Sequence, residues 1–319
     1  MPRVVVFDEI GPPDVLHIVE EPVPEPADGE VRVKIQAFGV NPVEQMMRTG
    51  AYPAPFRLPH ARIGLEGTGL IDAVGPGVEE FSIGDPVILA AVPRMDLNGT
   101  YAEYTTVPVS AVVARPAGLD VVGAAALWAV YSTAYGALIE KAAMHPGDRV
   151  LIQSASSNVG LAAIQIANQI GAVPIAVTRR SAKREALLAA GAHQVIATDE
   201  DDLLKSVAGV DIILDTVRGP GFAELAAAVK LGGTVISVGW SDPRPPTYPS
   251  APVTFINYMS FEHTLNPVTV RRIAAFLGAG LRTGALRPTI DQVFRFDDVV
   301  AAHEYLEKGQ YLGKIVVTL

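Results

Sequence analysis

The sequence contains no cysteine. Disulfide bonds, a cysteine nucleophile, an iron–sulfur cluster and a thiolate zinc site are therefore excluded, because each needs a cysteine sulfur. Histidine offers little replacement, since the six histidines lie far apart in the sequence and form no pair at ligand spacing. A zinc site would have to be assembled from residues distant in sequence, and we predict none.

The chain also lacks a surplus of positive charge and long apolar segments. Its formal net charge of −9 at pH 7 argues against nucleic acid and anionic membranes as partners, because both require a basic protein surface. Acidic and proline residues interrupt every apolar stretch well before the length of a membrane span. The N-terminal sequence MPRVVVFDEIGPP does not resemble a signal peptide. We expect a soluble, cytoplasmic protein that acts on a small molecule.

Apolar residues, glycine and proline are abundant. Of the 319 residues, 49% are hydrophobic and 18% are charged, with 29 glycines and 25 prolines, which predicts an enzyme of two lobes. Within residues 1–120, short apolar or alternating runs at 4–7, 31–38 and 83–89 are separated by glycine- and proline-rich turns. This part is predicted to be β-rich and without long helices.

Strands alternate with helices from about residue 121 onward. The predicted strands are 149–153, 174–178, 194–198, 211–217 and 234–240, and the predicted helices are 158–170, 183–190 and 222–230. Continuous β-branched strands are typical of a parallel sheet covered by helices on both faces. The fold class is therefore α/β, with a doubly wound parallel sheet of the nucleotide-binding kind.

The junction between the first of these strands and its helix is short and built of small residues. It contains Ser156, Ser157, Asn158, Val159 and Gly160. Such a turn lets a diphosphate approach the backbone at a helix N-terminus, where N–H groups and the helix dipole favour negative charge. Only the last glycine of the G-x-G-x-x-G fingerprint is present, so an ordinary strand–helix turn is an alternative. The position at the start of a βαβαβ run favours nucleotide binding.

The end of the second strand indicates which nucleotide binds. An NAD site usually has an acidic residue about 20 residues past the glycine turn, for the ribose 2′-hydroxyl. Here Thr178, Arg179 and Arg180 stand there, followed by Ser181 and Lys183. The alternative is a solvated helix start, but basic residues are unfavourable near a helix N-terminus. A cationic, hydroxyl-rich segment suits a 2′-phosphate, so the predicted cofactor is NADPH rather than NADH.

Ordered motifs along nearly the whole chain resemble the medium-chain dehydrogenase/reductase superfamily, and within it the zinc-free quinone oxidoreductase branch. The segment GVNPVEQMMRTGAY at 39–52 is similar to the branch's GVNPxD…RxGxY, and GLEGTG at 64–69 resembles its G-x-[ED]-x-x-G. Further motifs follow in the expected order: VGPGV at 74–78, GDPV at 84–87, GTYAEY at 99–104 and GKIVV at 313–317. No single motif is specific, whereas the ordered set is.

The resemblance implies a Rossmann NADPH-binding domain of residues 121–262 inserted into a GroES-like β domain of residues 1–120 and 263–319. The second part of the β domain is predicted to contain helices at 267–277 and 299–307 and a terminal strand at 314–319. The resemblance also implies a cleft between the domains for nicotinamide and substrate, and a homodimer formed through edge strands near residues 253–261.

The resemblance also implies roles for individual residues. Asn41 would orient the substrate or the nicotinamide ribose, Tyr52 would donate a hydrogen bond or a proton to the acceptor, and Tyr131 would face the cofactor. Each has a structural alternative: a turn residue before proline for Asn41, a solvated loop aromatic for Tyr52, and a buried core tyrosine for Tyr131. Further candidates for cofactor binding are Thr133, Val238, Gly239 and Trp240.

The sequence departs from the zinc enzymes of the superfamily. Asn41 stands in the segment of a cysteine ligand, and Leu65 replaces the histidine beside Glu66. Without a metal nothing evident activates an alcohol, whereas a quinone or an α,β-unsaturated carbonyl is already electrophilic. The leading hypothesis is zinc-independent hydride transfer from NADPH to such an acceptor.

Three alternatives stay open. A reductase dedicated to an enoyl thioester on a carrier protein would need basic residues for the 4′-phosphopantetheine arm, and Arg57 and Arg62 are candidates. A non-catalytic NADPH-binding sensor would bind the cofactor without turning over any acceptor. A metal-independent alcohol dehydrogenase is disfavoured because no base is evident.

Overall fold

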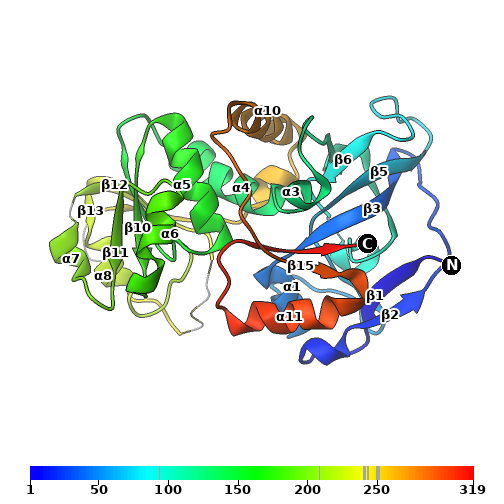
Figure 1. Cartoon of the computed structure of the whole chain (residues 1–319), viewed down its shortest axis with the longest axis horizontal. Helices are drawn as coiled ribbons and strands as arrows, with labels where there is room; N and C mark the ends of the chain where they lie inside the picture. Colours follow the sequence, from blue (N-terminus) through cyan, green and yellow to red (C-terminus); the bar gives the residue numbers. More distant parts are fainter. Residues whose placement is uncertain (93, 208, 240–241, 243, 249–251) are drawn as a thin grey trace. The chain divides into compact units, whose positions relative to one another are not determined.

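The chain, seen here as a computed structural model, is described for residues 1–92, 94–207, 209–239, 242, 244–248 and 252–319. The described residues fall into two compact units. Unit 1 comprises Met1–Ala129, Thr264–Ala274 and Pro288–Leu319, and unit 2 comprises Val130–His263 and Ala275–Arg287. The chain therefore begins in unit 1, builds most of unit 2, enters unit 2 once more at Ala275–Arg287 and ends in unit 1; the colours of Figure 1 follow this course.

Unit 2 is built on a parallel sheet. Its strands are β9 (Arg149–Ile152), β10 (Val173–Thr178), β11 (Gln194–Ala197), β12 (Val210–Asp215), β13 (Val229–Ser237) and β14 (Thr254–Asn257). They are arranged in the order β11-β10-β9-β12-β13-β14, and every neighbouring pair is parallel. The predicted doubly wound sheet is confirmed, and the strand order reverses between β9 and β12.

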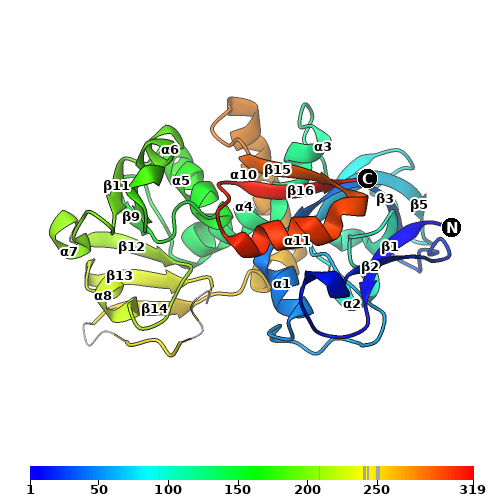
Figure 2. The ribbon, with the colours of Figure 1, turned by 60° about the horizontal axis from the view of Figure 1, so that its bottom comes forward.

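Helices connect the first five of these strands: α5 (Asn158–Ile170), η4 (Ser181–Lys183), α6 (Arg184–Ala189), α7 (Leu203–Ser206) and α8 (Phe222–Ala226). A π-helical turn, η3 (Gly136–Lys141), precedes β9. Helix α5 packs on β9 and β10, α6 on β11, and α8 on β13 (Figure 2). This is the arrangement expected of βαβ crossovers.

Local signals set the ends of α5. Ser157 caps its start with a side-chain hydrogen bond, and Gly171 ends it in the left-handed conformation at φ 90°. The predicted helix 158–170 is confirmed. The predicted helix 222–230 is too long, because Val229 already pairs with Val210 of β12 and so begins β13. Pairing with a strand distant in sequence decided that boundary.

Unit 1 contains two sheets. The first has the order β2-β1-β4, and the second β15-β16-β3-β5-β6-β8, with β7 also pairing with β3. The strands are β1 (Arg3–Phe7), β2 (His17–Glu20), β3 (Glu30–Val40), β4 (Ala61–Arg62), β5 (Gly67–Val74), β6 (Pro86–Leu89), β7 (Tyr104–Pro108), β8 (Val112–Ala114), β15 (Ile290–Arg295) and β16 (Lys314–Thr318). The C-terminal strand β16 lies antiparallel beside β3 (Figure 2). The returning end of the chain is therefore part of the unit 1 sheet.

The helices of unit 1 are short, as the proline content of its first 120 residues predicts. They are η1 (Pro13–Val15), α1 (Pro42–Arg48), α2 (Met95–Asn98), η2 (Val109–Ala111), α3 (Val121–Ala125), η5 (Phe296–Asp298) and α11 (Val299–Lys308). Three further helices carry residues assigned to both units: α4 (Trp128–Tyr135), α9 (Phe261–Thr264) and α10 (Pro267–Thr283).

A stacked aromatic pair and a buried histidine form part of the unit 1 core. The rings of Phe38 and Tyr101 have centroids 4.0 Å apart, and Nε2 of His303 lies 3.3 Å from the Tyr101 hydroxyl. His303 is fully buried, and its Nδ1 has no hydrogen-bond partner among the described residues. Arg48, also fully buried, is paired with Glu307. Burial and then the charge of Arg48 lower the pKa of His303 to about 3.

The neutral His303 should make folding sensitive to acid. A histidine of the unfolded chain titrates near pH 6.5, so between there and pH 3 the unfolded state binds a proton that the folded state does not. The contribution of His303 to the free energy of unfolding is therefore fully present above pH 6.5 and is lost as the pH falls. We expect the free energy of unfolding of the wild type, relative to His303→Leu, to fall by about 2 kcal/mol between pH 6.5 and 4.5. Urea unfolding followed by circular dichroism at each pH measures this difference.

His193→Leu is the matched control, because His193 is exposed, and its curve should run parallel to that of the wild type. A His303→Leu curve that is also parallel to the wild type would contradict the assignment.

Candidate functional site

The turn between β9 and α5 brings a helix N-terminus to the carboxyl edge of the parallel sheet. The hydroxyl oxygen of Ser157 accepts a hydrogen bond from the backbone N of Gly160 at 3.2 Å. A Cβ at Gly160 would lie 2.7 Å from both Cα and O of Ala155, so only glycine lets the helix pack this closely against the turn. The first turn of α5 therefore lies directly behind the loop, where its N–H groups favour an anion.

Residues of the predicted basic segment contact this turn. The backbone N of Ala155 donates to the carbonyl of Val177 in β10 at 2.9 Å. Lys183 Nζ donates to Ser156 Oγ at 3.1 Å. Thr178, the last residue of β10, is 5% exposed. The turn and the basic segment, predicted separately from the sequence, thus form one continuous region of unit 2.

Arg179 and Arg180 supply positive charge to this region. Both are exposed, and neither guanidinium has a hydrogen bond or an ion pair with any part of the chain that the structure describes. The nearby carboxylate of Asp199 is engaged elsewhere, because it accepts hydrogen bonds from the backbone N of Ser181 at 2.9 Å and from its Oγ at 3.2 Å. The two guanidinium groups are therefore available to an anionic ligand.

Polar residues that sequence reasoning missed lie where the strand order reverses. Gln153 follows β9, and Asp215 ends β12. The buried oxygens Gln153 Oε1 and Asn158 Oδ1 accept no hydrogen bond from the described residues. Asp215 is fully buried and accepts from Val217 N at 2.9 Å and from Ser237 Oγ at 3.1 Å. Ligands of doubly wound sheets bind at this point, and a polar residue at a strand end was the available sequence signal.

The residues after β13 lie at the same edge. Val238 N donates to the carbonyl of Asp215 at 2.8 Å. A Cβ at Gly239 would lie 2.7 Å from the carbonyl oxygen of Thr216, so a glycine is needed where the chain passes the end of β12. Trp240 lies outside the described residues.

Tyr131 and Thr133 lie on α4. Tyr131 is 3% exposed, and its hydroxyl donates to Gln165 Oε1 at 2.8 Å. The same Gln165 oxygen accepts from the backbone N of Arg287 at 2.8 Å. Burial raises the pKa of the Tyr131 phenol. Its hydroxyl is thus engaged with a residue of α5, and contact with a cofactor stays a prediction. Thr133 is half-buried.

Unit 1 holds a buried polar group of four residues, here called the Lys314 cluster: Asn41, Glu44, Glu66 and Lys314. Lys314 Nζ lies 2.5 Å from Glu66 Oε1 and donates to Asn41 Oδ1. Asn41 Nδ2 donates to Glu66 Oε1 at 3.1 Å and to Glu44 Oε1 at 3.2 Å. Both ends of the Asn41 amide are therefore engaged inside the cluster, and its contact with a substrate stays a prediction.

Glu44 is the titratable group of this cluster that responds near neutral pH. It is fully buried, and burial raises its pKa to about 7, although the charge of Lys314 acts in the opposite direction. The backbone N–H of Leu65 also donates to Glu44 Oε1, at 2.9 Å. Glu66 is held separately, since its Oε2 accepts from Ala129 N at 2.8 Å. The Lys314–Glu66 ion pair thus lies beside a carboxyl group that exchanges its proton near pH 7.

Tyr52 differs from the other predicted catalytic residues. Its ring packs against the apolar core of unit 1 and is half-buried. Its hydroxyl makes no hydrogen bond with any described residue. Burial, followed by the charges of Glu44 and Asp96, raises the pKa of Tyr52. Tyr52 is therefore a protonated and uncommitted hydrogen-bond donor at neutral pH.

The donor atoms of the Lys314 cluster do not suit a metal ion. The oxygens of Asn41 and Glu66 that face each other already bind the ammonium of Lys314, so a metal ion would have to displace a buried positive charge. Across the described residues, no group of three or more histidine, aspartate or glutamate side chains is placed to hold a metal. In that same part of the chain, no helix combines the length and apolarity needed to span a membrane.

Two family descriptions match the chain. Residues 27–117 match the alcohol dehydrogenase GroES-like domain, which confirms the predicted GroES-like fold in unit 1. Residues 190–317 match a zinc-binding dehydrogenase family. The chain is 33% identical over 333 residues to a quinone oxidoreductase of Lama guanicoe, covering 99% of this chain and 97% of that protein. It is also 33% identical over 328 residues to a quinone oxidoreductase of Homo sapiens, with coverages of 99% and 98%.

Solved structures share the fold over the full length. A mycobacterial protein complexed with NADPH is 28% identical, with 100% of both chains covered and a TM-score of 0.90. An NAD-dependent alcohol dehydrogenase is 29% identical, with 99% of both chains covered and a TM-score of 0.87. The CurK enoyl reductase is 26% identical, with 99% of both chains covered and a TM-score of 0.87.

Proposed function

The chain belongs to the quinone oxidoreductase branch of the medium-chain dehydrogenase/reductase family, and we propose that it is a zinc-independent, NADPH-dependent reductase of quinones or α,β-unsaturated carbonyl compounds. The observation that carries the proposal is the cationic region formed by Arg179, Arg180 and Lys183 beside the turn at the start of α5. A free phenol at Tyr52 supplies the donor that such an acceptor needs.

The charge of the region supports NADPH over NADH, in addition to the likeness to a protein solved with NADPH. One structural neighbour was solved with NADPH and another is named NAD-dependent, at 28% and 29% identity. In this chain, however, two guanidinium groups without partners among the described residues follow β10, and the adjacent Asp199 is held by Ser181. A 2′-phosphate would neutralise the guanidinium groups through charge-assisted hydrogen bonds.

Other residues of unit 2 would hold the rest of the cofactor. The first turn of α5 would bind the diphosphate through Ser157 to Gly160, where N–H groups converge. The unpartnered oxygens of Gln153 and Asn158 would accept hydrogen bonds from ribose hydroxyls. When bound, NADPH supplies the hydride.

We assign Tyr52 as the residue that touches the acceptor. Reduction of an enone or a quinone places negative charge on a carbonyl oxygen, and a donor aimed at that oxygen stabilises the transition state. The phenol of Tyr52 is protonated and uncommitted, whereas Asn41 and the phenol of Tyr131 already have partners. In this proposal Asn41 supports the site by holding the Lys314 cluster together, and Tyr131 supports it by fixing the position of α4.

Zinc independence is part of the proposal, although one matching family is described as zinc-binding dehydrogenase. The chain has no thiol ligand, and Lys314 Nζ binds the oxygens of Asn41 and Glu66. An ammonium at this place makes a second cation unfavourable.

We also propose that the active protein is a homodimer joined through β14. This strand pairs with β13 and with no other strand of the described residues, so one of its edges is free. Phe255, within it, is 37% exposed. A free edge with an exposed aromatic ring favours pairing with a second copy.

Oxidation of the nicotinamide cofactor is the first test. Chelator-treated protein is mixed with NADPH or NADH and with a panel of quinones and enones, and absorbance at the nicotinamide band is followed. We expect turnover with NADPH, weaker turnover with NADH, and no loss of rate on chelation. A requirement for added zinc would refute metal independence, and NADPH binding without turnover of any acceptor would favour a sensor role.

The phosphate-binding role of the basic segment is tested by Arg179→Ala combined with Arg180→Ala. Loss of two charge-assisted hydrogen bonds should raise KM for NADPH by about tenfold to a hundredfold while leaving KM for NADH nearly unchanged. Arg282→Ala is the control, because Arg282 is an exposed arginine of the same unit. Equal effects on the two cofactors would remove the basis for NADPH preference.

Tyr52→Phe tests the role of the phenol. The ring and its packing stay, so we expect kcat to fall by about a hundredfold, the lower end of the contribution of a proton donor, with KM for NADPH unchanged. Tyr104→Phe is the matched control, since Tyr104 is a half-buried tyrosine of the same unit. If both variants retain the wild-type kcat, Tyr52 does not act on the acceptor.

A further inference from the structure

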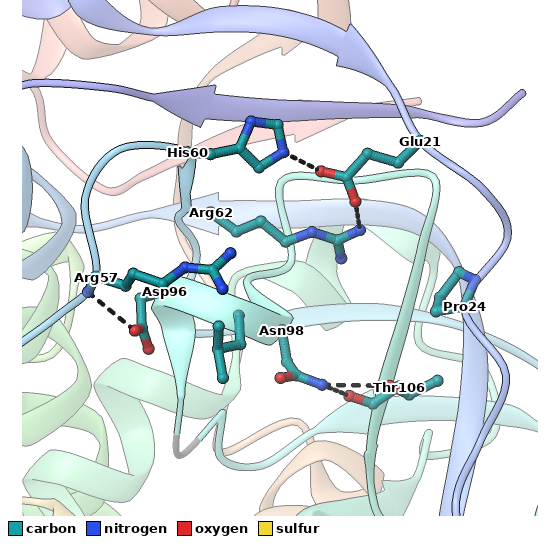
Figure 3. Close-up of a pocket in the computed structure, with 9 residues that line it drawn as sticks. Glu21, Pro24, Arg57, His60, Arg62, Asp96, Asn98 and Thr106 are labelled. Atoms are coloured by element: carbon teal, nitrogen blue, oxygen red, sulfur yellow. Dashed lines mark hydrogen bonds and ion pairs between the residues drawn. The ribbon is translucent and has the colours of Figure 1, made fainter.

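A pocket of about 170 Å³ lies within unit 1, apart from the Lys314 cluster (Figure 3). It is formed by the segment after β2, the segment leading into β4, and α2. The charged and polar side chains that line it include Glu21, Arg57, His60, Arg62, Asp96 and Asn98. Arg57 and Arg62, identified from the sequence as candidates for binding a phosphorylated arm, thus line one pocket.

The first carboxylate of the pocket is already neutralised. Arg62 Nη2 lies 2.5 Å from Glu21 Oε2, and His60 Nε2 lies 2.8 Å from Glu21 Oε1. Partial burial acts to raise the pKa of Glu21, but the hydrogen bond and charge of Arg62 outweigh it, so that the pKa is lowered. Glu21 is therefore an anion held by its own partners.

The second carboxylate is also paired. Arg94 donates to both oxygens of Asp96, from Nε at 2.8 Å and from Nη2 at 2.7 Å. The backbone N of Arg57 donates to Asp96 Oδ2 at 3.1 Å. The hydrogen bond from Arg94 lowers the pKa of Asp96. Asp96 therefore carries one charge that Arg94 balances.

The guanidinium of Arg57 has no partner among the described residues. Arg57 is exposed, and the chain as described offers its guanidinium neither a hydrogen bond nor an ion pair. Figure 3 shows this group extending from its loop into the pocket, with a dashed line only at its backbone nitrogen. Glu21 is paired with Arg62, and Asp96 is paired with Arg94, which lies outside the pocket lining, so the positive charge of Arg57 is available to an anion.

We propose that this pocket binds the phosphate ester of an acceptor arm, such as that of an enoyl thioester linked through phosphopantetheine. The planar guanidinium of Arg57 presents paired N–H groups that match two phosphate oxygens, and its single positive charge suits a phosphodiester anion.

The position of the pocket supports a link to the acceptor. Asp96, which lines it, is close enough to Tyr52 for its charge to raise the pKa of that phenol. An anchor at Arg57, which lies on the same loop as Tyr52 between α1 and β4, would hold one end of an elongated acceptor while the other end meets the phenol. The inference rests on the proposed function, of which it names the substrate class.

Steady-state kinetics with NADPH and two thioesters test the proposal. Crotonyl-coenzyme A carries phosphate groups, whereas crotonyl-N-acetylcysteamine has the same enoyl thioester without phosphate. We expect a lower KM for the coenzyme A ester than for the N-acetylcysteamine ester. Arg57→Gln should reduce the ratio of KM for the N-acetylcysteamine ester to KM for the coenzyme A ester by about tenfold, which corresponds to the loss of one charge-assisted hydrogen bond. Arg271→Gln, which removes an exposed arginine elsewhere in unit 1, should leave the ratio unchanged. An unchanged ratio in Arg57→Gln overturns the proposal.

A binding measurement separates failure of the site from failure of the function. Titration of 4′-phosphopantetheine into NADPH-saturated protein, followed by calorimetry, needs no turnover. Binding that weakens about tenfold in Arg57→Gln supports the site, even if only quinones or no acceptors are reduced. Binding that is absent or insensitive to Arg57 overturns it. Inorganic phosphate and free coenzyme A are titrated in parallel. Phosphate that binds as tightly as the esters would overturn the assignment to an acceptor arm.

Discussion

The buried ammonium of Lys314 constrains the whole of unit 1. Removing such a charge from water costs several kcal/mol unless partners compensate it, and here Glu66 and Asn41 do so. Asn41 precedes α1, Glu66 precedes β5, and Lys314 begins β16, so one cation ties three segments remote in sequence. Any change that leaves the ammonium or Glu66 alone would bury an unpaired charge. The same contact engages the facing oxygen atoms of Asn41 and Glu66.

In unit 2 the corresponding constraint is the need for glycine at two positions, Gly160 and Gly239. A Cβ at Gly160 or Gly239 would collide with neighbouring backbone, and the space kept by these glycines lies at the carboxyl edge where β9 and β12 meet. The unpartnered oxygens of Gln153 and Asn158 lie at the same edge. Buried polar atoms without partners are unfavourable, and the proposed ribose hydroxyls would supply hydrogen bonds to these two oxygens. In the proposed function, unit 2 would bind the cofactor and Tyr52 of unit 1 would be the proton donor.

Much of the fold was predictable from the sequence, and the errors of the prediction have a common cause. Helix α5 was predicted at its observed bounds, and the residues that start and end it, Ser157 and Gly171, lie directly beside it in the sequence. The end of α8 was predicted wrongly because Val229 pairs with Val210, a contact invisible in a local window. The candidate catalytic residues could not be ranked for the same reason. Tyr131 donates to Gln165, 34 residues away, and Asn41 accepts from Lys314, 273 residues away.

The sequence by itself determined the fold class, the exclusion of cysteine chemistry and the cationic segment at Arg179 and Arg180. These depend on composition, hydrophobic periodicity and the order of short motifs, which survive without coordinates. Only the tertiary structure decided which polar groups are already engaged. Among the described residues it left the phenol of Tyr52 and the guanidinium of Arg57 without a partner, and it surrounded the amide of Asn41 with partners. Hydrogen-bond partners are decided by proximity in space and not by distance along the chain.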